Sequence, residues 1–242
     1  MTIGLQRNTK KLFSNDGYLF LLALDHAQMG VVQGLEDIPA LLTRFSDSGL
    51  DGFILNVGLA RNMANSNLVH KKLVLRSSSG GSQLATEFAP SHANHVRPET
   101  AVALGADAVL MMAVVGGADY QSLQAVAKDI DAYHQLSIPV IVEIIAADFS
   151  KTATFDIQYH GARIASELGA DVVKVFYVEG FDKVAACCPV PVILAGGPKD
   201  QDICDVASRA IAQGAKGFAF GRNIFQSDKP EALINELKSI LR

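Results

Sequence analysis

A single lysine interrupts an apolar run in the middle of the chain. Residues 170–180 read ADVVKVFYVEG, so Lys174 follows two valines and precedes a valine and a phenylalanine. A desolvated lysine loses its proton more easily than an exposed one, and the neutral amine can attack a carbonyl carbon to form a Schiff base. The alternative is a buried structural ion pair between Lys174 and a carboxylate.

Four further residues could carry protons beside this lysine. Asp25 and His26 end the apolar run LFLLALDH, where a catalytic carboxylate and a proton carrier would lie, although Asp25 could equally cap a turn. Glu143 is a charge inside the run IPVIVEII and could either shuttle protons or pair with Lys174 across neighbouring strands. Tyr177, three residues after the lysine, is the fourth candidate.

Glycines follow two apolar runs in the last quarter of the chain, in LAGGPK and FGRNIFQ. Glycine lets backbone N–H groups approach a phosphate closely, and a neighbouring cation adds charge. A plain turn is the alternative role for such glycines. The pattern predicts a phosphate site formed by Gly196, Gly197, Lys199, Gly221 and Arg222.

A repeated phrase predicts the elements that must position these residues. Each copy reads as a helix end, a glycine turn and a strand, because a glycine suits the left-handed position that ends a helix. The copies are SGLDGFIL from Ser48, LGADAVLM from Leu104, LGADVVKV from Leu168 and QGAKGFAF from Gln213, with Gly49, Gly105, Gly169 and Gly214 at the turns.

Four other apolar runs, at 19–25, 72–78, 138–145 and 190–197, interleave with these copies and bring the expected strands to eight. Helical periodicity is found at 35–48, 121–135, 155–168, 201–213 and 229–241. Apolar strands that alternate with helices indicate a parallel sheet covered by helices.

The sequence therefore predicts an α/β fold, a (β/α)₈ TIM barrel, as a single domain over 1–242 with 1–17 as an N-terminal extension. A doubly wound sheet is less favoured, because the first turn, LDHAQMG, lacks the glycine fingerprint of that fold. The polar segment 84–99 is expected to form a loop over the barrel mouth. Catalytic residues of such barrels gather at the carboxyl ends of the strands, which is where Lys174 is expected.

Composition restricts the partners. With 21 basic and 25 acidic residues and no basic block, the chain is not expected to bind nucleic acid. The first apolar stretch ends at Leu24, too early for a membrane span, so no membrane partner is expected. The cysteines number three, two of them adjacent, which favours a reducing, cytoplasmic compartment. His92 and His95 are spaced like metal ligands but lack a carboxylate motif, so no metal site is predicted.

The segments LALDH, LGADVVKVFY, ILAGGPK and GFAFGRNIFQ resemble, in order and spacing, the archaeal-type class I fructose-bisphosphate aldolases of the DeoC/FbaB group. The resemblance runs from about Tyr18 to the C-terminus. It implies that Lys174 is the Schiff-base lysine, that Asp25 is the first-strand carboxylate, and that the glycine loops with Arg222 hold phosphate. It also implies a homo-oligomer.

Within this group, the stretch from Lys174 to Pro230 is most similar to the thiolases of the autoinducer-2 pathway. These enzymes transfer an acetyl group from a phosphorylated hydroxypentanedione to coenzyme A. Two positions depart from the aldolases. Ile145 stands where they carry a tyrosine acid and base at the end of the fifth strand, and Ala27 stands where they usually have glycine.

We therefore expect a Schiff-base aldolase-type carbon–carbon lyase that acts on a phosphorylated ketose, such as a sugar phosphate derived from dihydroxyacetone phosphate, without a cofactor. Acetyl transfer to coenzyme A as co-substrate is the alternative. A phosphate-binding barrel isomerase with Asp25 and Glu143 as acid and base, or an inactive phosphoketose-binding protein, are further alternatives.

Overall fold

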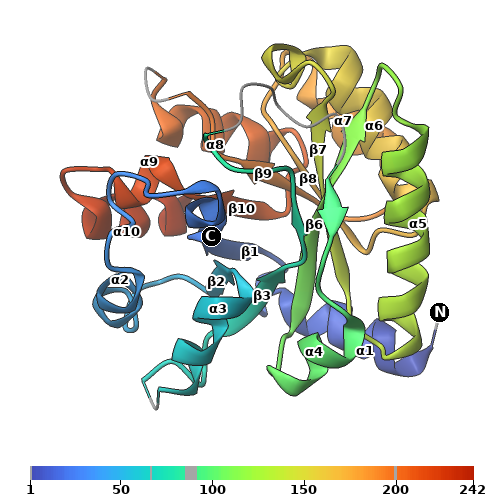
Figure 1. Cartoon of the computed structure of the whole chain (residues 1–242). Helices are drawn as coiled ribbons and strands as arrows, with labels where there is room; N and C mark the ends of the chain where they lie inside the picture. Colours follow the sequence, from blue (N-terminus) through green and yellow to red (C-terminus); the bar gives the residue numbers. More distant parts are fainter. Residues whose placement is uncertain (1, 66, 85–91, 199–200) are drawn as a thin grey trace.

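The computed structural model describes residues 2–65, 67–84, 92–198 and 201–242. Parallel strands close into a barrel in the order β1-β10-β9-β8-β7-β6-β3-β2 (Figure 1). The strands are β1 (Leu19–Ala23), β2 (Gly52–Leu55), β3 (Lys72–Arg76), β6 (Ala108–Val115), β7 (Val140–Ala146), β8 (Val172–Val175), β9 (Val192–Ala195) and β10 (Gly217–Phe220). Each matches one of the apolar runs, so the predicted (β/α)₈ barrel is confirmed.

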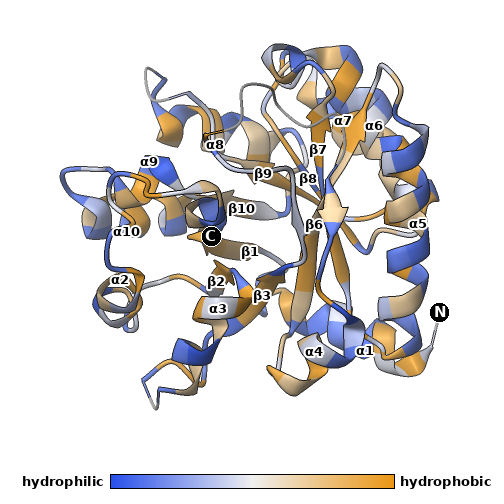
Figure 2. Ribbon diagram, viewed as in Figure 1, coloured by the Kyte–Doolittle hydropathy of each residue, from blue (hydrophilic) through white to orange (hydrophobic). Residues whose placement is uncertain are grey.

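Helices surround this barrel, with α5 and α6 on one side and α10 and α2 on the other in Figure 1. The strands are predominantly hydrophobic, and hydrophilic residues lie mostly on the helices and loops (Figure 2). Of the described helices, none combines the length and the apolar character needed to cross a membrane. The helices are α1 (Ile3–Leu12), α2 (Ile38–Arg44), α3 (Val57–Ala60), α4 (Pro98–Ala103), α5 (Tyr120–Gln135), α6 (Phe155–Glu167), α7 (Phe181–Cys187), α8 (Ile203–Ala212), α9 (Arg222–Phe225) and α10 (Pro230–Ile240), with 3-10 turns at Asp25–Met29, Arg61–Ala64 and Phe149–Lys151.

Alternation along the strands separates two apolar clusters. One contains every second residue of the strands and fills the barrel, for example Leu19, Leu21 and Ala23 of β1. The other packs the opposite faces of the same strands against the helices. Because side chains alternate with a period of two, the next inward positions beyond this apolar filling lie at the carboxyl ends of the strands. Four of these positions are charged: Asp25, Arg76, Glu143 and Lys174.

The amino end of the barrel is closed by α1, which falls within the predicted N-terminal extension. Leu12, its last residue, is 1% exposed and belongs to the inner cluster, and Phe13 packs against that cluster. The barrel therefore has a filled amino end, and an open chamber can form only at the carboxyl end.

The repeated phrase has a structural role at the amino end. Its aspartates Asp51, Asp107 and Asp171 accept hydrogen bonds from N–H groups of the first or second residue of neighbouring strands, at 2.7, 2.9 and 2.8 Å. Gly105, Gly169 and Gly214 have φ angles of +69°, +107° and +108°, as predicted for helix ends. Gly49 does not have positive φ. A Cβ there would lie 3.3 Å from Cγ of Lys238, so close packing rather than conformation favours that glycine.

A two-stranded antiparallel ribbon follows β3. It consists of β4 (Ser78–Ser79) and β5 (Ala93–Asn94), with Ser78 opposite Asn94. In the described part of the segment predicted as a loop, residues 84 and 92–99, β5 and the start of α4 are regular structure, and the other residues are in neither a helix nor a strand. Residues 85–91 of that segment lie outside the described residues. The ribbon brings the chain after residue 91 to the carboxyl end of the barrel.

Candidate active site

Lys174 and Glu143 form the centre of the site. They occupy directly opposite positions of the parallel neighbours β8 and β7, and the lysine Nζ lies 2.8 Å from Oε1 of Glu143. Lys174 is 6% exposed and Glu143 is 5% exposed. The ion pair expected across these two strands is present. The Glu143 carboxylate is a proton acceptor beside the amine. The same contact also fits the alternative that Lys174 and Glu143 form a buried structural ion pair.

Arg76 extends this pair on the other side of Glu143. Its guanidinium is 2% exposed, and Nη1 donates to Oδ2 of Asp25 at 2.8 Å and to Oε2 of Glu143 at 3.4 Å. The Nε–H donates to the carbonyl oxygen of Ser78 at 2.8 Å. Negative and positive side chains therefore alternate in a row of contacts, the ion-pair chain, formed by Asp25, Arg76, Glu143 and Lys174. The net charge of the four is zero when all are ionised.

Asp25 is held as a carboxylate by these neighbours. Burial favours its neutral form, but Arg76 and, to a smaller extent, His26 and Lys174 outweigh burial, so that the pKa of Asp25 lies below its ordinary value. The backbone carbonyl of Asp25 accepts a hydrogen bond from the Asn56 amide at 2.8 Å. An ionised Asp25 accepts protons poorly at neutral pH. It is therefore better suited to holding the Arg76 guanidinium in place than to acting as a general base.

His26 lies between this ion-pair chain and the strands β9 and β10. Burial lowers the pKa of His26, Asp25 partly opposes the effect, and Lys174 adds to it. Its Nδ1 is 3.7 Å from Oδ1 of Asp25, and its ring contacts Phe225 edge to face with centroids 5.8 Å apart. The imidazole is therefore neutral at pH 7.

A small recess follows strands β9 and β10, with a volume of about 60 Å³. A Cβ on Gly221 would lie 2.6 Å from Cε1 of His26 and 2.9 Å from the carbonyl oxygen of Ala23. A Cβ on Gly196 would lie 2.5 Å from Oδ1 of Asn223. The two glycines therefore make the recess possible. The recess is lined by Ala23, His26, Glu143, Lys174, Phe176, Ala195, Gly196, Gly197, Ala219, Gly221, Arg222 and Asn223.

The structure thus brings Gly196, Gly197, Gly221 and Arg222 together, as the sequence predicts. Lys199, the remaining predicted phosphate ligand, lies outside the described residues. Among the described residues, Arg222 takes part in no ion pair, whereas the two buried cations of the site do.

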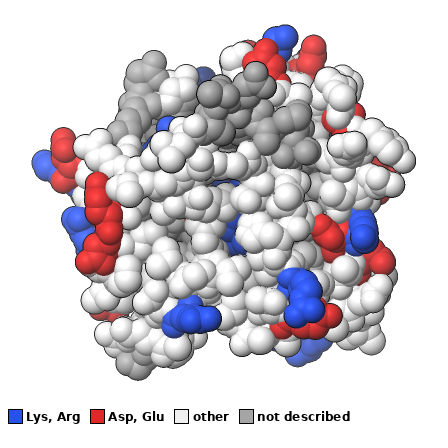
Figure 3. Space-filling model, viewed as in Figure 1, with Lys and Arg blue, Asp and Glu red and all other residues white. Residues whose placement is uncertain are grey.

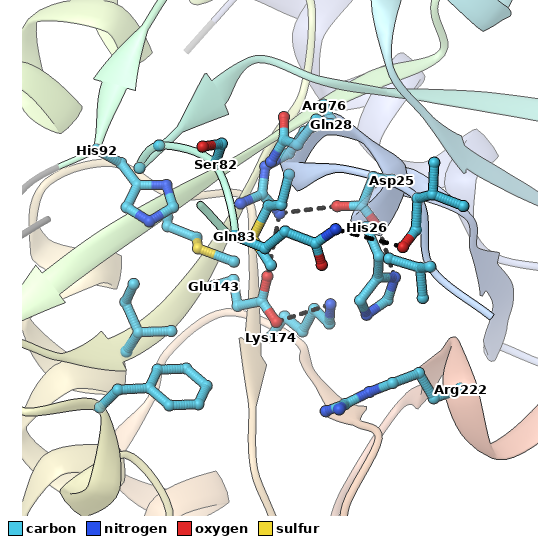
Figure 4. A pocket seen from close by; sticks show the side chains of 18 of the residues that line it. Asp25, His26, Gln28, Arg76, Ser82, Gln83, His92, Glu143, Lys174 and Arg222 are labelled. Atoms are coloured by element: carbon cyan, nitrogen blue, oxygen red, sulfur yellow. Dashed lines mark hydrogen bonds and ion pairs between the residues drawn. The ribbon is translucent and has the colours of Figure 1, made fainter. Parts of the chain in front are cut away.

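A larger chamber of about 660 Å³ opens on the other side of Lys174 (Figure 4). One wall is apolar and includes Met112, Ile145, Phe149 and Phe176. Figure 3 shows basic atoms within a central hollow whose surroundings are mainly uncharged, while most other charges lie near the outline. The chamber is lined by Asp25, His26, Gln28, Met29, Val31, Val32, Gln33, Arg76, Gly80, Gly81, Ser82, Gln83, His92, Met112, Glu143, Ile145, Phe149, Lys174, Phe176 and Arg222.

Tyr177 is the one described candidate that the structure does not place in the chamber or the recess. Its ring stacks on Phe181 with centroids 5.6 Å apart, and the Arg209 guanidinium lies over it at 4.9 Å. Lys174 and Phe176 share the inward side of the chain, so Tyr177 points to the helix side. The prediction of Tyr177 as a proton carrier is therefore corrected, because its ring packs on the helix side of the barrel and does not reach the chamber.

Two titratable residues of the chamber, Arg76 and His92, are absent from the predicted site. Arg76 stands at the end of KLVLR, where it reads as the first residue of a polar loop, although counting by twos from Val74 would have placed it inside the barrel. His92 is buried in the chamber wall, while His95 is exposed. Within the described residues there is no group of three or more histidine, cysteine or acidic side chains able to hold a metal ion.

Known proteins resemble this chain over most of its length. The profile of a family described as DeoC/LacD family aldolase matches residues 19–227. A protein of Klebsiella pneumoniae described as 3-hydroxy-5-phosphonooxypentane-2,4-dione thiolase is 34% identical, over 98% of this chain and 81% of its own length. A thiolase of the same description from Yersinia pestis is 32% identical, over 98% and 82%.

Among solved structures, an archaeal fructose 1,6-bisphosphate aldolase superposes with a TM-score of 0.85 at 24% identity, covering 98% of both chains. A second archaeal fructose-1,6-bisphosphate aldolase, described with its catalytic lysine covalently bound to the carbinolamine intermediate of the substrate, gives 0.84 at 24% identity, covering 98% of this chain and 99% of its own. At this identity the two likenesses show a shared fold.

Proposed function

This chain belongs to the DeoC/LacD family of aldolases, and from that premise we propose that Lys174 forms an imine with a ketose monophosphate and promotes cleavage of the neighbouring carbon–carbon bond. The observation that carries the proposal is the place of the lysine. It is buried where the recess meets the chamber, and it lines both. A carbonyl next to a phosphorylated carbon could therefore reach the amine while its phosphate occupies the recess.

Glu143 is suited to take the proton that Lys174 must lose before it attacks. The transfer runs from Nζ to Oε1 across the 2.8 Å contact. The amine then adds to the carbonyl carbon, and one of its protons passes to the carbonyl oxygen to give a hydroxyl. The proton on Glu143 returns to that hydroxyl, which leaves as water. The product is a protonated imine beside a carboxylate, so the net charge of the ion-pair chain is unchanged. Arg76 and Asp25 need not rearrange, which is the advantage of a preorganised site.

The protonated imine acts as an electron sink. When the bond between the next two carbons breaks, its electron pair moves into the imine and gives a neutral enamine, while the far fragment leaves as a carbonyl compound. The recess contributes by fixing the phosphate so that the carbonyl meets the amine, an orientation effect. A proton carrier is still needed at the far fragment, and Ile145 cannot supply one.

The charges that line the chamber favour a single phosphate. Among its described lining residues the lysine and arginine side chains are Arg76, Lys174 and Arg222. The first two are paired with carboxylates, which leaves Arg222 at the recess. Residues 85–91, outside the described part, contain no lysine or arginine in their sequence. A second phosphate in the apolar part of the chamber would lack a countercharge among the described lining residues, and burying it would be costly.

Acetyl transfer to coenzyme A is a second candidate. It is supported by the thiolase relatives, which are similar to 98% of the chain, and by the apolar chamber wall at Ile145. The same imine would serve both reactions, and they differ in what accepts the departing fragment. Coenzyme A as co-substrate, the homo-oligomer and the cytoplasmic location remain predictions.

Product analysis separates these candidates. The wild type and Lys174→Arg, which keeps the charge but loses the nucleophile, are incubated with a panel of ketose monophosphates and with phosphorylated hydroxypentanedione, each with and without coenzyme A. Cleavage without coenzyme A supports the lyase, and acetyl-coenzyme A supports the transferase. An isomerised product formed equally by the arginine variant would contradict both, because it would show a reaction that needs no amine.

A further inference from the structure

His92 is a buried titratable side chain that the reaction described above does not use. It lies in the chamber wall and is 7% exposed. The β4–β5 ribbon holds it there, since Ala93 and Asn94 pair with Ser79 and Ser78. A Cβ on Gly80 would lie 2.5 Å from Nε2 of His92, so a glycine at position 80 leaves room for the ring. The ribbon is therefore built to carry an imidazole in the chamber.

His92 lies away from the phosphate recess. In Figure 4 it and Arg222 are on opposite sides of Lys174 and Glu143. The recess is lined by His26 but not by His92, and the charges of Arg76 and Glu143 act on His92. A substrate with its phosphate in the recess and its carbonyl at Lys174 would therefore extend its far fragment into the chamber that His92 lines.

Elimination points to the same residue. Among the described chamber residues, four titratable groups form the ion-pair chain: Asp25, Arg76, Glu143 and Lys174. His26 and Arg222 also line the recess. Apart from His92, the other described lining residues of the chamber, Met112 and Ile145 among them, have no titratable side chain.

We propose that His92 is the catalytic residue that carries the proton during bond cleavage. The proposal rests on the imine function assigned to Lys174. His92, next to the ribbon after β3, would then carry the proton that Ile145 on β7 cannot carry.

His92 is neutral at pH 7, so its ring can take a proton only transiently during the reaction. Burial is the main effect and, together with Arg76, lowers the pKa of His92 to about 4, while Glu143 acts in the opposite direction. The ring is therefore neutral at pH 7, and a neutral imidazole can both accept and donate a proton. The imidazolium that forms during the reaction is stabilised by the Glu143 carboxylate and is a strong enough acid to return its proton quickly.

His92 moves one proton from the substrate hydroxyl to the enamine carbon. A ring nitrogen of His92 takes the proton from the hydroxyl on the far carbon, and the O–H electron pair becomes the second bond of the leaving carbonyl. The electrons of the carbon–carbon bond move into the protonated imine, which becomes a neutral enamine. The imidazolium then gives its proton to the enamine carbon, which restores the protonated imine. Water hydrolyses this imine and releases the second product.

Hydrogen exchange isolates the last proton transfer with one probe. Dihydroxyacetone phosphate in D₂O is incubated with the wild type, His92→Gln, Gly80→Ala and His95→Gln. Imine formation is measured as the mass added after borohydride reduction, and enamine formation as deuterium incorporated at the carbon next to the carbonyl. The Gly80 variant displaces the ring without removing it. His95 is an exposed histidine of the same segment and serves as the matched control.

We expect His92→Gln to lose exchange by about 10²- to 10⁴-fold, the usual contribution of a proton carrier, while it still gains mass on reduction. Gly80→Ala should lose exchange to a smaller extent, and His95→Gln should match the wild type. Full exchange in His92→Gln, or loss of imine formation together with exchange, would overturn the assignment. Absence of adduct in the wild type would instead contradict the proposed function itself.

Discussion

Replacing Arg76 with methionine tests the ion-pair chain that organises the site. Methionine has a similar length and no charge, so the variant removes the donors to Asp25 and Glu143 at 2.8 and 3.4 Å with little change in volume. Two buried carboxylates then share one cation, Lys174. Removing one member of a buried pair costs about 3 to 5 kcal/mol, because the remaining charge is left without compensation. The unfolding equilibrium should change by a factor of roughly 10² to 10⁴.

The loss should depend on pH in a defined direction. In the wild type the pKa of Asp25 lies below its ordinary 3.8, so its ionisation stabilises the fold above that pH, and the contribution is lost as the pH falls through the folded-state pKa. In Arg76→Met, burial raises the pKa of Asp25 without opposition from the guanidinium. The variant should then lose stability as the pH rises through that value, and the difference from wild type should be largest at neutral pH.

Urea unfolding followed by circular dichroism at pH 7 and at pH 4 measures this difference. Arg44→Met is the control, because it breaks an exposed pair with Glu231 whose charges are screened by water. Adding Asp25→Asn to Arg76→Met should recover part of the lost free energy, since it removes the uncompensated charge. An Arg76→Met protein as stable as wild type at pH 7, or one with the same loss at both pH values, would refute the role given to Arg76.

The proposed phosphate site in the recess and the histidines give two further predictions. Gly221→Ala and Gly196→Ala should weaken binding of inorganic phosphate, measured by calorimetry, by tenfold or more (about 1.4 kcal/mol), because each added Cβ meets His26 or Asn223 at 2.6 or 2.5 Å. Gly58→Ala, whose Cβ would meet nothing within 4 Å, should bind normally, and equal binding by all three variants would contradict the recess. His26 should titrate below 6.5 and His92 near 4 in NMR spectra. As the pH falls, His92 is protonated in the unfolded state near 6.5 but in the folded state only near 4. The folded state therefore loses stability as the pH falls from 6.5 toward 4. The decline over this range should therefore be smaller in His92→Gln, and an unchanged decline would argue against a buried neutral ring.

Much of the fold could be predicted because it depends on local and periodic signals. The repeated phrase marks helix ends and strand starts, and each aspartate in it accepts a strand N–H at the amino end of the barrel. The pairing of Lys174 with Glu143 could be predicted for the same reason, since both interrupt the apolar pattern of consecutive barrel strands. Helix α1 was harder to predict from the sequence, because it lies before the first strand, in a segment that contains no copy of the repeated phrase.

The rest of the site depends on contacts that are distant in sequence. His92 enters the chamber only because the β4–β5 ribbon pairs residue 78 with residue 94, and short strands of two residues leave almost no pattern. Arg76 is the last residue of β3 and precedes serines and glycines, so a charged residue there suggests the start of a loop. Tyr177 was predicted from its residue type, which suits proton transfer, but its side chain packs on Phe181 outside the chamber.

Peptide mapping after reductive trapping tests the central claim most directly. The wild type and Lys174→Arg are incubated with dihydroxyacetone phosphate and borohydride, digested and analysed by mass spectrometry. A Schiff-base site at the junction of recess and chamber predicts one reduced adduct, on the peptide that contains Lys174, and none in the arginine variant. Adduct spread over exposed lysines such as Lys151, or an equal amount in Lys174→Arg, would contradict the account.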